Sequence, residues 1–253
     1  MKAIRITAFG GPEVMQYTDL PDPVAGDLEI VLDVTAVGIN YADTHQTENS
    51  YLSPQTLPMV PGIEVTGTHA GKRYLASVSS GGYAQKAIAH EAALIPIPDA
   101  VTDQQALCML VQGSTAWHLL KTMGSVKAGQ TVVIHAAAGG VGTIAIQLAK
   151  MWGAKVIAVT SSQEKVDLAK SLGADEVVDA RDSDLGKALR AANGGRGVDL
   201  VLEMVGGTTF DQSFLALGNF GKLITFGMAS RTAPTPIHPG SLMHGSQTVA
   251  GFW

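Results

Sequence analysis

A glycine-rich turn at residues 137–142, of sequence AAGGVG, has the spacing of a dinucleotide-binding fingerprint with alanine in its first glycine position. Gly139 would let the backbone approach a pyrophosphate, and Gly142 would let the following helix pack against the preceding strand. The N-terminus of that helix offers free N–H groups and the positive end of the helix dipole to an anion. The turn therefore predicts a dinucleotide-binding site.

The tip of the next predicted strand bears on which dinucleotide fits. An acidic side chain at this position binds the ribose 2′-OH of NADH and repels a 2′-phosphate. Here the tip carries the hydroxyl of Ser161 and no acid, and Lys165 lies one helical turn further on, where it can neutralise a phosphate. The pattern favours NADPH. Alternatively, Ser161 is the N-cap of the next helix, Glu164 completes a capping box and Lys165 is a solvated surface residue; both interpretations can hold together.

The elements that would position these residues alternate between strand and helix beyond residue 127. Apolar runs and helical periodicity predict strands at residues 131–134, 155–160, 176–179, 199–205, 222–226 and 247–252, with helices after the glycine turn and at residues 163–172, 183–192 and 208–217. Six strands with helical crossovers are the number that a full doubly wound parallel sheet of the Rossmann type needs.

The first part of the chain has a different pattern. Strands are predicted at residues 2–8, 29–37, 64–68, 74–78 and 83–89, separated by Gly and Pro, which indicates a compact β-rich domain. Within the second strand, alternation puts Ile30, Leu32, Val34 and Ala36 on one face. A capping box at residues 102–105 opens helices expected at 103–111 and 114–122. We therefore divide the chain into a β-rich domain at residues 1–98 and a Rossmann domain at residues 99–253.

Composition excludes several classes of function. The net charge is −5 and no Lys/Arg run is longer than two residues, which argues against a nucleic-acid partner. No apolar run approaches the roughly 18 residues of a membrane span, so we expect a soluble, cytoplasmic protein that does not bind membranes. Only 15% of residues are charged, which favours a homo-oligomer. The single cysteine, Cys108, excludes an internal disulfide and a Cys-rich zinc site, and we expect it to be buried on a helix.

Seven short motifs together resemble the zinc-independent quinone oxidoreductase branch of the medium-chain dehydrogenase/reductase superfamily, the zeta-crystallin-like reductases. They lie at residues 10–14 (GGPEV), 38–43 (GINYAD), 61–64 (PGIE), 81–84 (GGYA), 112–116 (QGSTA), 135–142 (HAAAGGVG) and 249–253 (VAGFW). The resemblance implies a GroES-like β-rich domain followed by a Rossmann domain. It also implies NADPH as cofactor and a quinone or related α,β-unsaturated carbonyl as the small-molecule substrate.

The resemblance also assigns site residues. Asn40 would face the nicotinamide, with Asp43 and His45 following on the same loop as the other catalytic candidates. His45 stands where many relatives have tyrosine; it could donate a proton to a developing oxyanion, or it is a polar residue at the pocket rim with no catalytic part. The implied cofactor contacts are Asn40, Thr115, Ala138, Gly139, Gly140, Val141, Gly142, Ser161, Lys165, Phe226 and Gly227.

The same resemblance predicts a metal-free site. In the zinc alcohol dehydrogenases of this superfamily a cysteine stands where this chain has Asn40, and a histidine precedes the glutamate where it has Ile63. Neither replacement can bind zinc in that way.

Two further features shape the functional prediction. Relatives continue past the motif at residues 249–253, so a C-terminal segment that returns to the first domain is expected to be absent. The last strand, residues 247–252, would be a sheet edge through which relatives pair, which predicts a homodimer. The leading function is NADPH-dependent reduction of a quinone or enone. An enoyl reductase acting on thioesters and a non-catalytic NADPH-binding protein are the alternatives.

Overall fold

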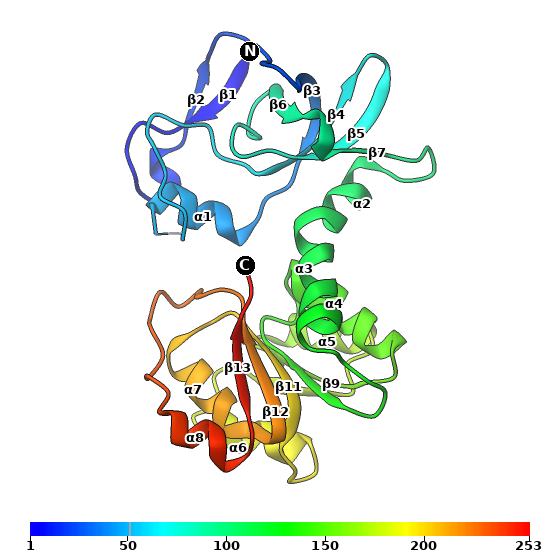
Figure 1. Ribbon diagram of the computed structural model, residues 1–253, viewed down its shortest axis with the longest axis vertical. Helices are drawn as coiled ribbons and strands as arrows, with labels where there is room; N and C mark the ends of the chain where they lie inside the picture. Colours follow the sequence, from blue (N-terminus) through cyan, green and yellow to red (C-terminus); the bar gives the residue numbers. More distant parts are fainter. Residues whose placement is uncertain (51) are drawn as a thin grey trace. The chain divides into compact units, whose positions relative to one another are not determined.

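The computed structural model describes residues 1–50 and 52–253, which form two compact units, Met1–Val111 and Gln112–Trp253 (Figure 1). The division lies after Val111, later than the boundary between residues 98 and 99 that the sequence pattern favoured. The reason is that helix α2, Asp103–Cys108, packs on the sheet of the first unit.

The first unit is built on a five-stranded antiparallel sheet with strand order β6-β3-β4-β5-β7, accompanied by a two-stranded ribbon of β1 and β2. A short helix, α1 (Tyr41–Glu48), lies between β3 and β4 in the sequence, where the motifs had predicted a loop. The strands are β1 (Lys2–Arg5), β2 (Gln16–Asp19), β3 (Glu29–Val37), β4 (Glu64–His69), β5 (Lys72–Ser77), β6 (Lys86–His90) and β7 (Leu94–Pro96).

The two faces of this sheet are packed differently. Leu32, Val65 and Ala76 form the centre of one apolar cluster. Ala36 does not share that face, contrary to the alternation predicted for β3, because the register between β3 and β4 shifts after Val34. It packs instead in the cluster that joins α2 to the sheet, around Leu107.

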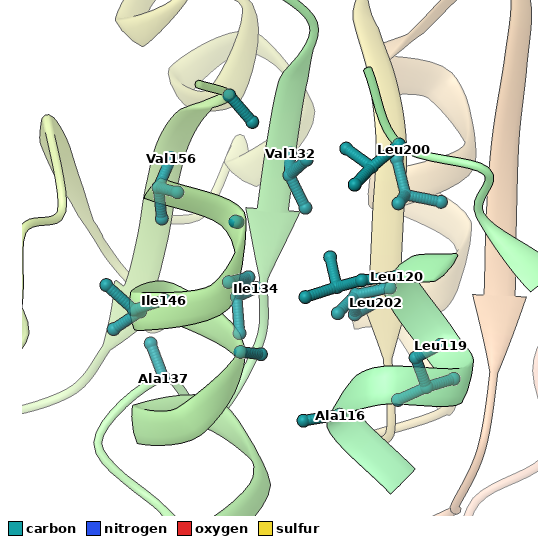
Figure 2. Packing of buried hydrophobic residues seen from close by; sticks show 14 of the residues in the cluster. Ala116, Leu119, Leu120, Val132, Ile134, Ala137, Ile146, Val156, Leu200 and Leu202 are labelled. Atoms are coloured by element: carbon teal, nitrogen blue, oxygen red, sulfur yellow. The ribbon is translucent and has the colours of Figure 1, made fainter. Parts of the chain in front are cut away.

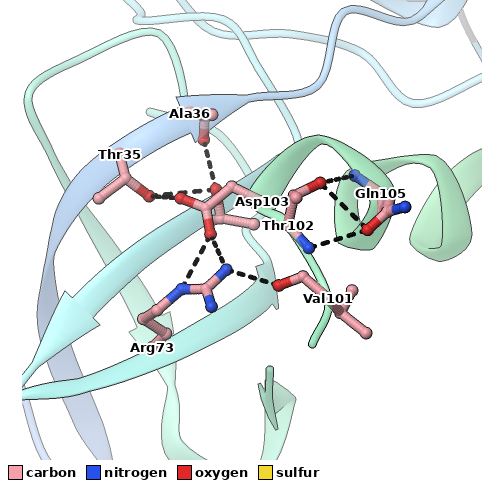
Figure 3. A network of polar contacts seen from close by, with 8 residues as sticks. Thr35, Ala36, Arg73, Val101, Thr102, Asp103 and Gln105 are labelled. Atoms are coloured by element: carbon pink, nitrogen blue, oxygen red, sulfur yellow. Dashed lines mark hydrogen bonds and ion pairs between the residues drawn. The ribbon is translucent and has the colours of Figure 1, made fainter. Parts of the chain in front are cut away.

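Polar contacts fix the start of α2 on the sheet (Figure 3). The predicted capping box is present, since Thr102 Oγ1 accepts the N–H of Gln105 and the side-chain Oε1 of Gln105 accepts the N–H of Thr102. Asp103 Oδ2 accepts the hydroxyl of Thr35 at 2.5 Å, and Asp103 Oδ1 accepts both Nε and Nη2 of Arg73. These bonds hold the pKa of Asp103 below its usual range, first through Thr35 and then through Arg73.

The second unit is a six-stranded parallel sheet with strand order β10-β9-β8-β11-β12-β13. This order, in which the first strand lies at the centre and the fourth beside it, is that of a complete dinucleotide-binding sheet, so the Rossmann prediction is confirmed. The strands are β8 (Thr131–Ile134), β9 (Lys155–Thr160), β10 (Glu176–Asp179), β11 (Val198–Glu203), β12 (Leu217–Thr225) and β13 (Thr248–Gly251), and the helices are α3 (Ser114–Trp117), α4 (Gly140–Met151), α5 (Gln163–Ser171), α6 (Leu185–Ala192), α7 (Gly207–Ala216) and α8 (Pro239–His244).

Apolar side chains cover both faces of this sheet. On one face Ile146 of α4 and Leu120 belong to the same apolar cluster as Leu202 of β11 (Figure 2). On the other face, Leu189 of α6 and Phe210 of α7 cover the alternate residues of the same strands. A buried strand with apolar residues on both sides reads as a continuous apolar run, which is why these strands could be located from the sequence.

The predicted helices at residues 103–111 and 114–122 are shorter than expected. Two π-helical segments, Met109–Gly113 and His118–Met123, follow α2 and α3. Cys108 ends α2 and is exposed, so the expectation that it is buried is wrong. Among the residues that the structure describes, no helix is long and apolar enough to cross a membrane.

Candidate functional site

The glycine turn joins the end of β8 to the N-terminus of α4. Gly139 is the N-cap of α4 with an extended backbone, and both Gly139 and Gly140 are exposed. A Cβ on Gly142 would lie 2.5 Å from the carbonyl oxygen of Ala136 and 2.6 Å from the Cα of Ala137, so only glycine allows this helix to approach the strand. The turn thus combines close packing at its third glycine with an accessible helix N-terminus, the arrangement that binds a pyrophosphate.

Ser161 and Lys165 lie at the neighbouring strand tip. Ser161 is half-buried directly after β9, outside the helix, because α5 begins at Gln163 with Ser162 as its N-cap. No side chain caps this helix, so the alternative capping box between Ser161 and Glu164 is not formed. Lys165 is exposed in the first turn of α5 and makes no ion pair with any described residue. A cation at the positive end of a helix dipole is locally unfavourable by about 0.3–1 kcal/mol, and a bound anion would relieve this.

Phe226 and Gly227 follow the carboxyl end of β12 and share the same sheet edge. Ile134 of β8 pairs with Ala158 of β9, while Glu203 of β11 pairs with Thr225 of β12. The glycine turn, Ser161 and Phe226 therefore all follow the carboxyl ends of parallel strands, where open α/β sheets bind ligands. Thr115 is half-buried in α3, on the helical segment that packs against α4.

Two buried ionisable groups lie at the carboxyl ends of strands of this sheet. His135 follows β8 and is fully buried, with its Nε2 at 2.8 Å from Ser213 Oγ of α7; burial lowers the pKa of His135 to about 4. The Glu203 side chain is also inaccessible, and its Oε1 accepts the N–H groups of Val205 and Gly206. Burial raises the pKa of Glu203. Both residues are placed to fix strand ends and the loop that follows β11.

In the first unit, Asn40 is the centre of a buried polar network. It is the N-cap of α1, and its backbone N–H donates to Asp43 Oδ2 at 2.8 Å. Its side-chain Nδ2 donates to Glu64 Oε1 on β4 at 2.7 Å. Tyr83 Oη donates to the same oxygen of Asp43 at 2.6 Å. The predicted catalytic residues Asn40 and Asp43 are therefore joined to two residues that the sequence analysis did not single out as site residues.

The carboxylates of this network are buried away from water. Asp43 is 3% exposed and Glu64 is 1% exposed. Burial raises the pKa of both groups, although hydrogen bonds from Tyr83 and Asn40 oppose the rise. Burial and the bond to Asp43 also raise the pKa of Tyr83, so its hydroxyl is a donor throughout the physiological range.

His45 lies within α1 rather than on a loop, so the predicted loop placement of Asp43 and His45 is wrong. The helix was missed because residues 41–48 carry almost no apolar periodicity. His45 is 7% exposed, its Nδ1 lies 3.0 Å from Ser50 Oγ, and its ring meets that of Tyr41 edge-on at 5.8 Å. It is therefore buried and positioned by neighbours on both sides.

Within residues 1–50 and 52–253, no group of three or more His, Cys, Asp or Glu side chains is placed to hold a metal ion.

Comparison with known proteins relates this geometry to one group of enzymes. The family model described as "Zinc-binding dehydrogenase" matches residues 140–253. The quinone oxidoreductase of Sus scrofa is 30% identical over 264 residues, which covers 99% of this chain and 79% of that protein.

Two solved structures are similar over the whole chain. The quinone oxidoreductase from Thermus thermophilus, solved also as its complex with NADPH, is 37% identical with a TM-score of 0.88, covering 100% of this chain and 80% of that one. The Escherichia coli quinone oxidoreductase complexed with NADPH is 32% identical with a TM-score of 0.92, covering 100% of this chain and 81% of that one. This chain therefore spans about four fifths of the length of each.

Proposed function

Because the chain belongs to the quinone oxidoreductases of the medium-chain dehydrogenase/reductase superfamily, we propose that it transfers hydride from NADPH to a quinone or a related α,β-unsaturated carbonyl. The observation that carries the proposal is the sheet edge of the second unit. There, an accessible glycine turn, the Ser161 hydroxyl and the exposed cation of Lys165 follow adjacent strand ends. This combination suits a pyrophosphate and a ribose 2′-phosphate together.

The proposal assigns the cofactor contacts to residues of the second unit. The N–H groups at the start of α4 would bind the pyrophosphate, and Lys165 would neutralise the 2′-phosphate. Ala138 and Val141, which flank the glycines, and Thr115 and Phe226 would complete the contacts. When bound, the cofactor supplies the hydride.

In the first unit, Asn40, Asp43 and His45 are the proposed catalytic residues. Hydride addition to an enone or quinone leaves negative charge on oxygen, which needs a proton or a hydrogen-bond donor. His45 is the group in this set whose ordinary pKa lies nearest neutrality. We assign it the role of proton donor. His45→Ala should lower kcat for the acceptor while leaving the dissociation constant of NADPH unchanged, and an unchanged kcat in both His45→Ala and His45→Tyr would remove the assignment.

Substrate profiling tests the proposed function. NADPH oxidation is followed with a naphthoquinone, an alkenal and a crotonyl thioester at matched concentrations. We expect the naphthoquinone to give the highest kcat/KM. Preference for the thioester would identify an enoyl reductase, and tight NADPH binding without turnover of all three would identify a non-catalytic NADPH-binding protein.

We further propose a homodimer that pairs through β13. This strand is the outer strand of the six-stranded sheet formed by the described residues, and an outer strand can pair with a second copy. Light scattering at micromolar concentration should give twice the chain mass, and a monomer would contradict the pairing. The single, exposed Cys108 suits a reducing compartment, and we propose the cytoplasm, to be checked by cell fractionation.

A further inference from the structure

The Glu64 side chain lies between two hydrogen-bond donors, and each of its oxygens accepts one of them. Its Oε1 accepts Nδ2 of Asn40 at 2.7 Å, and its Oε2 accepts the backbone N–H of Val111 at 3.0 Å. An ionised carboxylate accepts at both oxygens, whereas a protonated acid or an amide presents a donor on one side. The two accepted bonds favour the charged form of Glu64, which burial at 1% exposure opposes.

The bond to Val111 lies where the α-helix α2 is followed by a π-helical segment. In a regular α-helix this N–H would donate to the carbonyl four residues earlier. Val111 lies within the π-helical segment Met109–Gly113, directly after α2. A side chain that inserts into the hydrogen-bond ladder of a helix is a recognised cause of local distortion of that helix. Glu64 thus contacts both the cap of α1 and the backbone beyond α2.

The backbone beside Glu64 is shaped to leave room for this side chain. A Cβ on Gly38, which follows β3, would overlap the Cγ and Oε1 atoms of Glu64. Gly38 does not have a positive φ, so alanine is conformationally allowed there and glycine is needed for space alone. The N–H of Gly38 also donates to the Glu64 carbonyl at 3.1 Å, which keeps the two residues in contact.

We propose that Glu64 is a positioning residue that fixes the orientation of the Asn40 amide at the catalytic end of α1 and ties it to the π-helical segment that contains Val111. The kinetic part of this assignment rests on the proposed reductase function, because it takes Asn40 to contact the reacting ligands. The structural part, that Glu64 orients the Asn40 amide, does not depend on the proposed function. Asp43 and Tyr83 belong to the same network. No hydrogen bond recorded for the described residues joins either of them to the Glu64 carboxylate, but the Asp43 charge helps raise the pKa of Glu64 and the Glu64 charge helps raise that of Tyr83.

The test uses Glu64→Gln in the full chain, with Thr66→Val as the matched control. Thr66 lies two residues further on in β4, on the same sheet face, is 0% exposed and bonds Thr35 and the Ala36 carbonyl rather than Asn40. Both substitutions are close to isosteric. The first readout is the side-chain amide signal of Asn40 in ¹⁵N-labelled protein, identified by its loss in Asn40→Ser. The second is the pair of kcat and the dissociation constant of NADPH.

We expect Glu64→Gln to shift the Asn40 amide signal toward that of an amide in water and to lower kcat by roughly 10- to 100-fold, the range of one hydrogen bond to a charged group. Thr66→Val should leave the amide signal in place and change kcat less than twofold. Gly38→Ala, which displaces the Glu64 carboxylate without removing it, should shift the same signal and serves as the second variant if Glu64→Gln does not fold.

Three results would overturn the assignment. The first is an Asn40 amide signal that neither Glu64→Gln nor Gly38→Ala shifts. The second is a shifted signal with an unchanged kcat in an active enzyme. The third is a Thr66→Val protein whose amide signal and kcat change as much as those of Glu64→Gln. If the unmodified protein turns over no acceptor, the proposed function fails, while the amide signal still decides whether Glu64 positions Asn40.

Discussion

Replacing two glycines of one turn should separate the fold of the second unit from its cofactor binding. In Gly142→Ala, the new Cβ would meet backbone atoms at 2.5–2.6 Å, whereas ordinary van der Waals contact begins at 3.4 Å. The atoms are the Ala136 oxygen and the Cα and oxygen of Ala137, none of which can rotate away. The helix α4 must therefore move relative to β8.

The magnitude follows from two opposing effects. Alanine in an unobstructed helix is favoured over glycine by about 1 kcal/mol. Overpacking a rigid contact costs about 1–3 kcal/mol. Because all three contacts are with backbone, we place the overpacking cost of Gly142→Ala at the upper end and expect a net loss of about 1–2 kcal/mol in the free energy of unfolding.

Gly139→Ala is the matched change in the same turn. Its Cβ would meet only the Ala136 oxygen, at 3.1 Å, and the backbone of Gly139 is in an extended conformation that alanine adopts readily. We expect its stability to remain within about 0.5 kcal/mol of the unmodified protein. Because the methyl group would stand where the pyrophosphate approaches, NADPH affinity should fall roughly tenfold or more, which is at least about 1.4 kcal/mol.

Urea unfolding followed by tryptophan fluorescence suits this experiment. Trp152 is the C-cap of α4 and meets Trp117 edge-on at 5.3 Å, and all three tryptophans of the chain lie in the second unit. NADPH affinity is measured separately by fluorescence titration. A Gly142→Ala protein as stable as the unmodified one would refute the packing argument, and full NADPH affinity in Gly139→Ala would refute the placement of the pyrophosphate.

Two further changes test the electrostatics of the second unit. Lys165→Ala should lower the ratio of kcat/KM for NADPH to that for NADH roughly tenfold, because a charge-assisted contact with the 2′-phosphate is lost; an unchanged ratio would remove Lys165 from the site. His135 protonates at its ordinary 6.5 when unfolded but only at about 4 when folded, so its contribution to stability is complete above pH 6.5 and is lost as the pH falls toward 4. The whole loss amounts to about 3 kcal/mol, and His135→Gln should remove that part of the pH dependence of the unfolding free energy; an identical pH dependence in both proteins would contradict it.

The Rossmann sheet could be predicted from the sequence because its physical causes are local. Apolar runs such as residues 131–134 are buried on both faces, and the glycines of the turn are required by contacts within a few residues. The same locality explains the correct capping box at Thr102, whose partner is three residues away.

The buried network of the first unit could not be found in this way. Asn40 and Glu64 are 24 residues apart, and Asp43 and Tyr83 are 40 residues apart, so neither pairing leaves a periodic trace. All four lie within motifs on which the family resemblance rested, yet only the fold brings them together. Helix α1 was missed for a related reason, since its buried residues are polar.

The central claim is that NADPH passes hydride to a quinone on this chain. The most direct measurement is NADPH oxidation in the presence of a naphthoquinone, repeated with NADPH deuterated at the transferred position. We predict quinone-dependent oxidation, one NADPH consumed for each two-electron reduction, and a slower rate with the deuterated cofactor in single turnover. NADPH that binds tightly but is not oxidised by any quinone would contradict the claim.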